Sequence, residues 1–203
     1  RFFGEQSWRF HYNKRIVDIL DINNIRVEKV VEEIFPDLIL TFGCGILKKD
    51  TFFEKSTNGI INLHSGIVPD YRGVDNVYWC LHNDEPSQIG ATIHYIVRHI
   101  DMGDILAQVY PSINTTDDEL TLFNKTILSG IDSFKKVISD FERNGKKLVG
   151  TKQSYRGQLY QEKDRTVFTD FKVERFLVNG GLKKALRKEK KEIFYQREGF
   201  STH

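Results

Sequence analysis

Short apolar runs alternate with helical segments along the first 150 residues, and this alternation restricts the possible folds more than any other feature of the chain. The apolar runs have the length of strands and cover residues 37–43, 59–64, 89–97 and 105–113. Apolar residues at helical spacing cover residues 13–24, 27–35, 74–84 and 115–145. Strands separated by helices predict an α/β fold with a mostly parallel sheet that helices cover on both faces.

The last of these helical segments carries start and stop signals. Thr116 and Glu119 have the spacing of a capping box, and Asp117 and Asp118 are anions where the helix dipole favours them. Gly145 can end the helix. The pattern becomes polar and irregular after residues 148–151, so we expect a catalytic domain at 1–150 and a C-terminal extension at 151–203.

Charge and cysteine content limit the partners and the compartment. The chain has 30 basic and 28 acidic residues, and a net charge of +2 creates no general demand for an anionic partner. Cys44 and Cys80 are too few and too far apart for a disulfide framework or a zinc site. No apolar run approaches the ~20 residues that span a bilayer. We therefore expect a cytoplasmic protein that uses no metal and no membrane.

Two polar side chains stand at the end of the second apolar run, in "GIINLHSGIVPDYRG" at 59–73. Side chains alternate along a strand, so Asn62 and His64 should emerge on one face, at the carboxyl end where α/β proteins place functional groups. Asp101 follows the next apolar run, in "RHIDMGDIL". An amide to hold a carbonyl, an imidazole to move a proton and a carboxylate to orient it are typical of acyl transfer. The alternative for a single strand-end histidine is a structural role.

These segments resemble the folate-dependent formyltransferases. "GIINLHSGIVPDYRG" and "IGATIHYIVRHIDMGDILAQ" carry Asn-x-His, Pro-x-x-x-Gly and Asp-x-Gly motifs, with "PDLILTFGCGIL" upstream and "YWCLHNDEP" between them. The similarity covers roughly residues 34–145. It implies a Rossmann-like α/β fold and transfer of a formyl group from 10-formyltetrahydrofolate to an amine, with Asn62, His64 and Asp101 as the catalytic residues.

The mechanism implied by this resemblance is attack of a neutral amine on the formyl carbon. Asn62 would donate its amide hydrogens to the resulting oxyanion, and His64 would add a second donor. Asp101 would raise the pKa of His64 through its opposite charge and relay the amine proton through water. His94 is assigned a structural role.

The resemblance also implies where the folate binds. It places the pterin ring against the main chain of 42–47 and 96–101, with Ile46, Leu47 and Val97 packing against the ring; ordinary core packing is the alternative. The expected folate-binding residues are Phe42, Gly43, Ile46, Leu47, Ile96, Val97 and His99.

For the amine we expect a nucleotide-linked amino sugar. Tyr71 and Arg72, expected to be exposed in the turn, and the aromatic Tyr78 and Trp79 would contact it; alternatively, Tyr71 and Arg72 pack within the turn and the other two are core residues of a helix. His-Ser-Gly at 64–66 also favours sugar-formylating members of the family. Nucleic acid is not the expected partner, and a homodimer is left open.

Other functions are kept as alternatives. The same residues would serve a formyltetrahydrofolate hydrolase, or a formyltransferase acting on glycinamide ribonucleotide or methionyl-tRNA. A non-catalytic folate-binding remnant is the third class. The Asn-x-His motif comes earlier in this chain than in the family, so we expect that the opening strand and its glycine-bearing loop are missing and that the sequence is a fragment.

Overall fold

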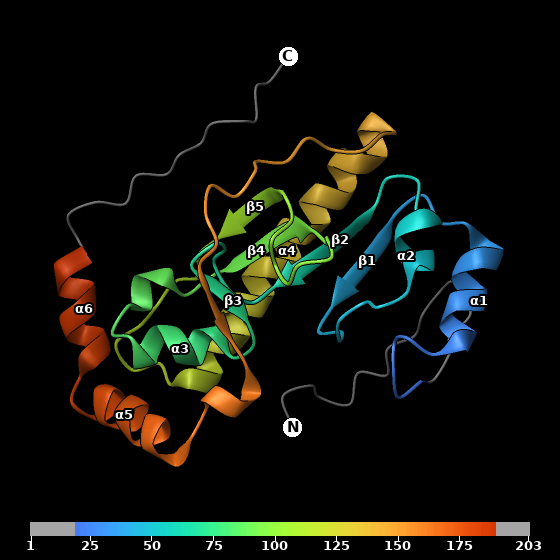
Figure 1. Ribbon diagram of the computed structural model, residues 1–203. Helices are drawn as coiled ribbons and strands as arrows, with labels where there is room; N and C mark the ends of the chain where they lie inside the picture. The colour runs from blue at the N-terminus through green and yellow to red at the C-terminus, as the bar shows by residue number, and fades with distance from the viewer. Residues whose placement is uncertain (1–18, 190–203) are drawn as a thin grey trace, which may run out of the picture.

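The computed structural model describes residues 19–189, which form a central sheet with helices on both sides (Figure 1). The four strands of this sheet are ordered β1-β2-β4-β5. Their bounds are Ile39–Phe42 for β1, Ile60–His64 for β2, Ala91–Tyr95 for β4 and Ile105–Val109 for β5. The predicted α/β class is confirmed.

The strand directions differ from the prediction. β1 and β2 are parallel, whereas β2–β4 and β4–β5 are antiparallel, so the described sheet is mixed rather than mostly parallel. The reason lies in the connections. A simple crossover helix would return the chain parallel to β2, but residues 65–90 hold both a strand of a second sheet and a helix. The loop at 96–104 then reverses the chain directly into β5.

The second sheet joins distant parts of the chain. β3 (Tyr71–Gly73) pairs in parallel with β6 (Gln158–Tyr160), with Arg72 opposite Leu159. Thr151 also forms a bridge with Ile105 of β5. The segment after the long helix α4 thus runs back across the molecule between β5 and β3 (orange in Figure 1). The boundary expected at 148–151 stays a prediction, but the residues just after it are tied to the central part of the molecule.

Six α-helices surround the two sheets within the described range. Their bounds are Ile25–Ile34 (α1), Asp50–Glu54 (α2), Asn76–His82 (α3), Glu119–Asn144 (α4), Val167–Val178 (α5) and Gly181–Glu189 (α6). The helices expected at 27–35, 74–84 and 115–145 are therefore present. The one expected at 13–24 falls mostly outside the described residues, and residues 19–24 form a turn.

The start of α4 corrects the predicted capping box. Asp118, not Thr116, is the N-cap, and its carboxylate accepts a hydrogen bond of 2.7 Å from the Thr121 N–H. Asp117 instead pairs with Lys125 at 2.7 Å. Two acidic residues compete with the threonine for the cap, and the carboxylate nearer to the first turn takes it. At the other end Gly145 is left-handed with φ of 62°, as predicted for a helix stop.

The two faces of the central sheet bury different cores. Ile61, Leu63 and Ile93 pack with Val137 of α4 on one face. At Gly130 of α4 an added Cβ would lie 2.7 Å from a Leu63 methyl, so this glycine allows the close approach of helix and sheet.

On the opposite face Ile60 packs with Leu47 and with Phe52 of α2. Since side chains alternate, Ile60, Asn62 and His64 share this second face. The candidate site therefore lies on the side of the sheet covered by α1 and α2.

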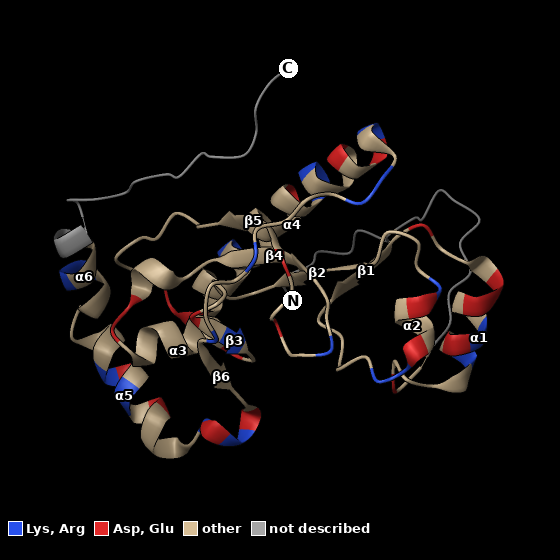
Figure 2. Ribbon diagram, turned by 45° about the horizontal axis from the view of Figure 1, so that its top comes forward, with Lys and Arg blue, Asp and Glu red and all other residues tan. Residues whose placement is uncertain are grey.

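The surface carries mixed charges. Figure 2 shows basic and acidic residues interspersed along α1, α4 and α5. Among the helices of residues 19–189, none is long and apolar enough to cross a membrane.

Candidate active site

The pairing of β2 with β4 assembles the polar side chains of the site. Asn62 lies opposite His94, and His64 lies opposite Thr92. Paired residues of neighbouring strands share a face, so the site receives two histidines from two strands. The ring centroids of His64 and His94 are 5.9 Å apart, in an edge-to-face arrangement.

Asp101 reaches between these two histidines from the loop after β4. Its Oδ2 lies 3.6 Å from His64 Nδ1, and its Oδ1 lies 3.4 Å from His94 Nε2. The Gly73 N–H of β3 donates a hydrogen bond of 2.8 Å to Oδ2. The side chains of the two histidines are 6% and 1% exposed, and that of Asp101 is 12% exposed. The site is thus a nearly buried cluster of titratable groups that opens to solvent only at its edge.

The amide of Asn62 has a defined orientation. Its Oδ1 accepts a hydrogen bond of 2.9 Å from the Thr41 hydroxyl of β1. Its Nδ2 lies 3.4 Å from His94 Nε2, at the limit of a hydrogen bond. One strong contact on the oxygen and one weak contact on the nitrogen leave amide hydrogens available to an incoming carbonyl oxygen.

His64 is held by the turn that follows β2. Its Nε2 lies 2.9 Å from the Tyr71 carbonyl oxygen and 3.2 Å from Asn76 Nδ2. A carbonyl only accepts, so we assign a hydrogen to Nε2. An added Cβ at Gly66 would lie 2.6 Å from Nε2, which gives the glycine of His-Ser-Gly a steric reason. The Nδ1 atom of His64 is then the one that faces Asp101.

Burial and neighbouring groups shift the pKa values of Asp101 and His64. Burial by itself raises the pKa of Asp101, but hydrogen bonding by His94, the charge of His64 and the Gly73 N–H outweigh it and lower that pKa to about 2. Burial lowers the pKa of His64, and this effect exceeds the raising effect of Asp101. Asp101 thus raises the pKa of His64, as predicted, but desolvation of the imidazolium outweighs the neighbouring carboxylate and the net direction is downward.

Two neighbouring loops contain the predicted folate-binding residues. Ile46 and Val97 are exposed apolar residues, and Gly43 is left-handed with φ of 59°. The loops are linked by an ion pair between Asp50 and Arg98. Exposed apolar side chains on adjacent loops next to a buried polar site are suited to an aromatic ligand.

The other predicted folate-binding residues are placed differently. Leu47 is buried in the core with Phe52. Its side chain therefore fits the alternative of core packing rather than contact with a ligand. Ile96 packs against the same core cluster, and its N–H donates to the Ile60 carbonyl. Phe42 pairs with Leu63 and is exposed on the α4 side of the sheet, the face opposite to Asn62. His99 is exposed.

The expected exposure of Tyr71 and Arg72 is wrong. Tyr71 is buried, and its hydroxyl donates a 2.5 Å hydrogen bond to Glu85. Arg72 is 1% exposed and donates hydrogen bonds of 2.8 and 3.0 Å to the Ile100 carbonyl. These residues belong to β3, and its pairing with β6 covers them. Their predicted contact with substrate is untested, but both side chains are engaged within the chain.

Tyr78 and Trp79 are buried on α3, which agrees with the alternative that they are core residues of a helix. Trp79 stacks on Tyr160 of β6 with ring centroids 4.7 Å apart. The Arg165 guanidinium lies over the Tyr78 ring at 3.9 Å from its centroid.

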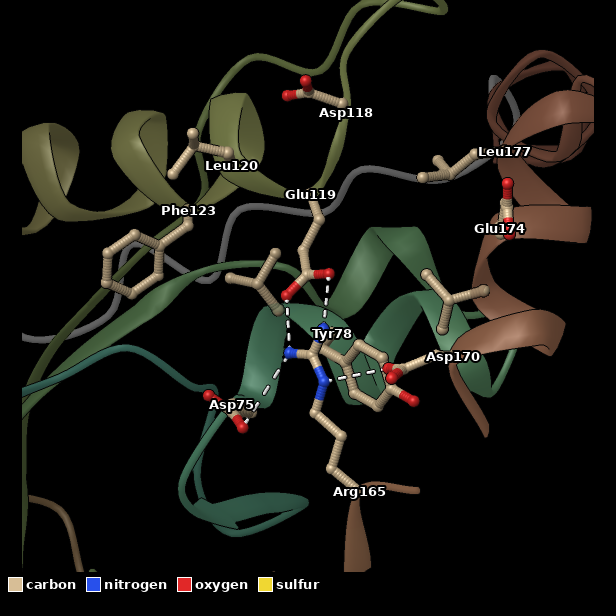
Figure 3. A pocket seen from close by; sticks show the side chains of 12 residues that line it. Asp75, Tyr78, Asp118, Glu119, Leu120, Phe123, Arg165, Asp170, Glu174 and Leu177 are labelled. Atoms are coloured by element: carbon tan, nitrogen blue, oxygen red, sulfur yellow. Dashed lines mark hydrogen bonds and ion pairs between the residues drawn. The ribbon is translucent and has the colours of Figure 1, made fainter. Parts of the chain in front are cut away.

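A cavity lies away from the histidines. It has a volume of about 670 Å³ and lies between α3, α4 and α5, and Figure 3 shows its side chains. Arg165 spans it, bonded to Glu119 at 2.9 and 3.2 Å and to Asp170 at 3.0 Å. Its ionic groups already satisfy one another, whereas those around Asp101 are only loosely paired. The cluster around Asp101 is therefore the candidate site.

His94 lies closer to Asp101 than the sequence indicates. The sequence predicts a structural role for it, which stays a prediction, and its Nε2 is closer to the Asp101 carboxylate than the Nδ1 of His64 is. The signal that could have revealed it was the antiparallel register of β4, which puts His94 beside Asn62. An apolar strand with one histidine does not give that register by itself.

The fold and the site together define a class. An α/β sheet that brings a half-buried amide, two buried imidazoles and a loop carboxylate together is suited to acyl transfer. Comparison with known proteins gives the family. A model of the formyl transferase family matches residues 22–138, and the chain belongs to that family.

Individual relatives include two kinds of formyltransferase. The methionyl-tRNA formyltransferase of Finegoldia magna is 26% identical over 170 residues, covering 77% of this chain and 54% of the relative. The formyltransferase PseJ from Anoxybacillus kamchatkensis, solved with a formamido sugar nucleotide and tetrahydrofolate, is 27% identical with a TM-score of 0.55, covering 63% of this chain and 66% of that one.

A further solved relative is the N-formyltransferase of Helicobacter canadensis in complex with folinic acid and dTDP-3-aminofucose. It is 26% identical with a TM-score of 0.51, covering 62% of this chain and 46% of that one. The chain spans about half or less of the length of the curated relatives that it matches.

Proposed function

We propose that this chain carries the catalytic centre of an enzyme that transfers a formyl group from 10-formyltetrahydrofolate to a primary amine on a nucleotide-linked amino sugar. The observation that carries the proposal is the Asp101 carboxylate between two buried histidines, beside an amide whose nitrogen makes only one weak contact. Residue types and geometry both suit transfer of an acyl group.

The chain offers a suitable surface for the folate. Ile46 and Val97 supply exposed apolar contact, and main-chain groups of residues 42–47 and 96–101 suit the amide-like edge of a pterin. The folate supplies the formyl group when it is bound. The remaining chemistry is done by the side chains of the site.

The amide of Asn62 donates to the formyl oxygen as that oxygen gains negative charge. A donor placed in this way contributes ~2.7–4 kcal/mol to the transition state. His64 is neutral at rest because burial lowers its pKa, so it can take up the proton that the amine loses, directly or through water. Asp101 then stabilises the imidazolium at 3.6 Å.

Two observations support a sugar nucleotide as the acceptor. Solved relatives from Anoxybacillus kamchatkensis and Helicobacter canadensis hold sugar nucleotides together with a folate. The charges on α1, α4 and α5 are interspersed rather than gathered into one basic stripe (Figure 2), and a basic footprint is the usual mark of nucleic-acid binding.

Methionyl-tRNA is the second candidate acceptor. The observation in its favour is the set of curated relatives, which are methionyl-tRNA formyltransferases with identities up to 35% over about half of this chain. The catalytic residues would act in the same way on either amine. The acceptor therefore has to be decided by assay.

A parallel assay tests both proposals. The protein is mixed with 10-formyltetrahydrofolate and, separately, with amino-sugar nucleotides, glycinamide ribonucleotide and methionyl-tRNA, and formylated product is measured by mass spectrometry. We expect product with a sugar nucleotide. Product with methionyl-tRNA or glycinamide ribonucleotide, and with none of the sugar nucleotides, would replace the proposed acceptor. Formate released without any amine would indicate a hydrolase. Absence of product with every acceptor would overturn the proposal.

A further inference from the structure

Gln153, in the segment that follows α4, contacts the loop that carries Asp101. Its Nε2 donates hydrogen bonds of 2.8 Å to the Asp101 carbonyl and 2.9 Å to the Gly103 carbonyl. The two bonds come from a residue about 50 positions later in the chain and meet the loop at two points. They hold the backbone on either side of Met102.

The loop at this point has an unusual conformation. Asp101 is left-handed with φ of 50°, which costs an L-residue roughly 1 kcal/mol or more and persists only where the surroundings impose it. At Gly103 an added Cβ would lie 1.7 Å from the Tyr95 carbonyl oxygen, so the loop lies tightly against β4. A loop in this state needs bonds from outside to keep its shape.

β3 provides the other contacts. Arg72 donates to the Ile100 carbonyl, and the Gly73 N–H donates to the Asp101 carboxylate itself. Arg72 also bonds to the Gly157 carbonyl at 3.0 Å, which ties the segment of Gln153 to the same strand. The main chain at 100, 101 and 103 is therefore held from two sides, and the carboxylate is aimed between the histidines.

The orientation of the Gln153 amide is fixed by these contacts. Its Oε1 is buried and has no hydrogen-bond partner. The opposite orientation would place Oε1 against two carbonyl oxygens, which is less favourable still. A buried acceptor without a partner destabilises the fold, so the two bonds made by Nε2 are what the amide contributes.

We propose that Gln153 is a positioning residue for catalysis, which fixes the Asp101 carboxylate between His64 and His94. The effect on kcat rests on the proposed function, whereas the effect on the position of the carboxylate does not. The charged and titratable groups that face Asp101 are His64 from β2, His94 from β4 and Arg72 from β3. If the loop relaxes, the carboxylate moves away from the histidines.

The test compares Gln153→Leu and Gln153→Met, which nearly keep the volume, add no charge and cannot donate to the carbonyls. Full-chain protein is titrated by NMR, observing the His64 ring and the Asp101 carboxyl carbon. We expect the Asp101 transition to move up from about 2 and the His64 transition to move down, because each group loses the other's charge. Opposite shifts of two neighbouring groups are not produced by a general loss of stability.

Kinetics provide the second readout. We expect kcat with the accepted amine to fall roughly 10- to 100-fold in both variants, with KM changed less than about twofold, because misplacement of a catalytic group acts on the reaction rather than on binding. Gln153→Lys keeps N–H donors within reach and should retain kcat within about threefold.

Gln108→Ala is the matched control, since Gln108 also donates to a backbone carbonyl, that of Val68 at 2.7 Å, away from the Asp101 loop. It should lower the melting temperature without moving either titration. Unchanged titrations in a folded Gln153→Leu or Gln153→Met protein would overturn the proposal. If the wild-type protein formylates none of the amines, the proposed function fails while the titrations still decide the role of Gln153.

Discussion

Two clusters of charged side chains lie on either side of the start of α3, and they are built in opposite ways. Around Arg165 the partners are partly exposed, and the guanidinium makes two close bonds to Glu119 and one to Asp170. Around Asp101 the partners are nearly buried, and the histidine nitrogens stand 3.4 and 3.6 Å away. In the first cluster, called the saturated cluster below, each ionic group has a close partner. In the second cluster the groups are incompletely paired, so a proton or a substrate group can still bind there.

Cavity size alone gives no reason to place the chemistry beside Arg165. The cavity of about 670 Å³ is lined by ionic groups that satisfy one another. The groups around Asp101 are desolvated and incompletely paired, which is the usual environment of reactive groups. The two clusters should therefore respond differently to substitution and to acid.

Asp101→Asn should have the largest effect. We expect kcat to fall about 10³-fold, because the variant cannot stabilise the imidazolium of His64. Folate affinity should change little and can be followed as the rise in melting temperature with 5-formyltetrahydrofolate. The matched control is Asp170→Asn in the other cluster, which should keep kcat within about threefold. Equal kcat in Asp101→Asn and wild type would remove Asp101 from the mechanism.

Asn62→Ala should have the next largest effect. We expect kcat to fall about 10²- to 10³-fold, because the variant removes one donor to a developing oxyanion. Thr41→Val removes only the bond that orients the amide, so it should reproduce part of the loss. Steady-state kinetics with saturating amine measure both. A rise in KM at constant kcat would instead make Asn62 a residue of ground-state binding.

Acid should destabilise the protein through the buried cluster. The Asp101 pKa is lowered to about 2 from 3.8, so its contribution to stability is present above pH 3.8 and is lost as the pH falls through about 2; it amounts to about 2 kcal/mol. The His64 pKa is lowered by burial, so stability also decreases as the pH falls below 6.5. Urea unfolding at a series of pH values should show both losses. The pH 2–4 portion should be smaller in Asp101→Asn, and an identical profile would contradict the assignment.

The smallest effect is expected at the saturated cluster. Glu119→Gln should reduce the free energy of unfolding by less than about 1 kcal/mol, because partly exposed ion pairs contribute little. It should leave kcat unchanged. A double-mutant cycle with Arg165→Gln measures the coupling between the two side chains. A large loss of activity in Glu119→Gln would show that the cavity takes part in the reaction and that the two clusters do not differ in role.

Local patterns predicted the parts of the site that depend on one strand. The alternation along β2 put Asn62 and His64 on one face, and the helical spacing with Gly145 predicted the extent of α4 to within a few residues. Asp101 could be expected near them because it follows a neighbouring strand. These features depend on the period of the apolar residues and on capping chemistry, which are local properties.

The parts that were missed depend on pairing between distant segments. The burial of Tyr71 and Arg72 comes from β6, which the sequence did not indicate because three residues at 158–160 make a weak strand signal. The antiparallel direction of β4, and with it the place of His94 beside Asn62, depends on how residues 65–90 fold. The net direction of the His64 pKa likewise depends on burial, which no motif reports.

The pairing of β3 with β6 has a consequence for the biosynthesis of the protein. The ribosome releases the N-terminal part of a chain first, and contacts between residues far apart in sequence form late. Asn62, His64 and Asp101 therefore emerge well before Gln153 and β6, which complete the support of the Asp101 loop. A nascent chain that has just finished α4 contains every predicted catalytic side chain, yet its activity should switch on only after residues 151–160 have been translated and have docked.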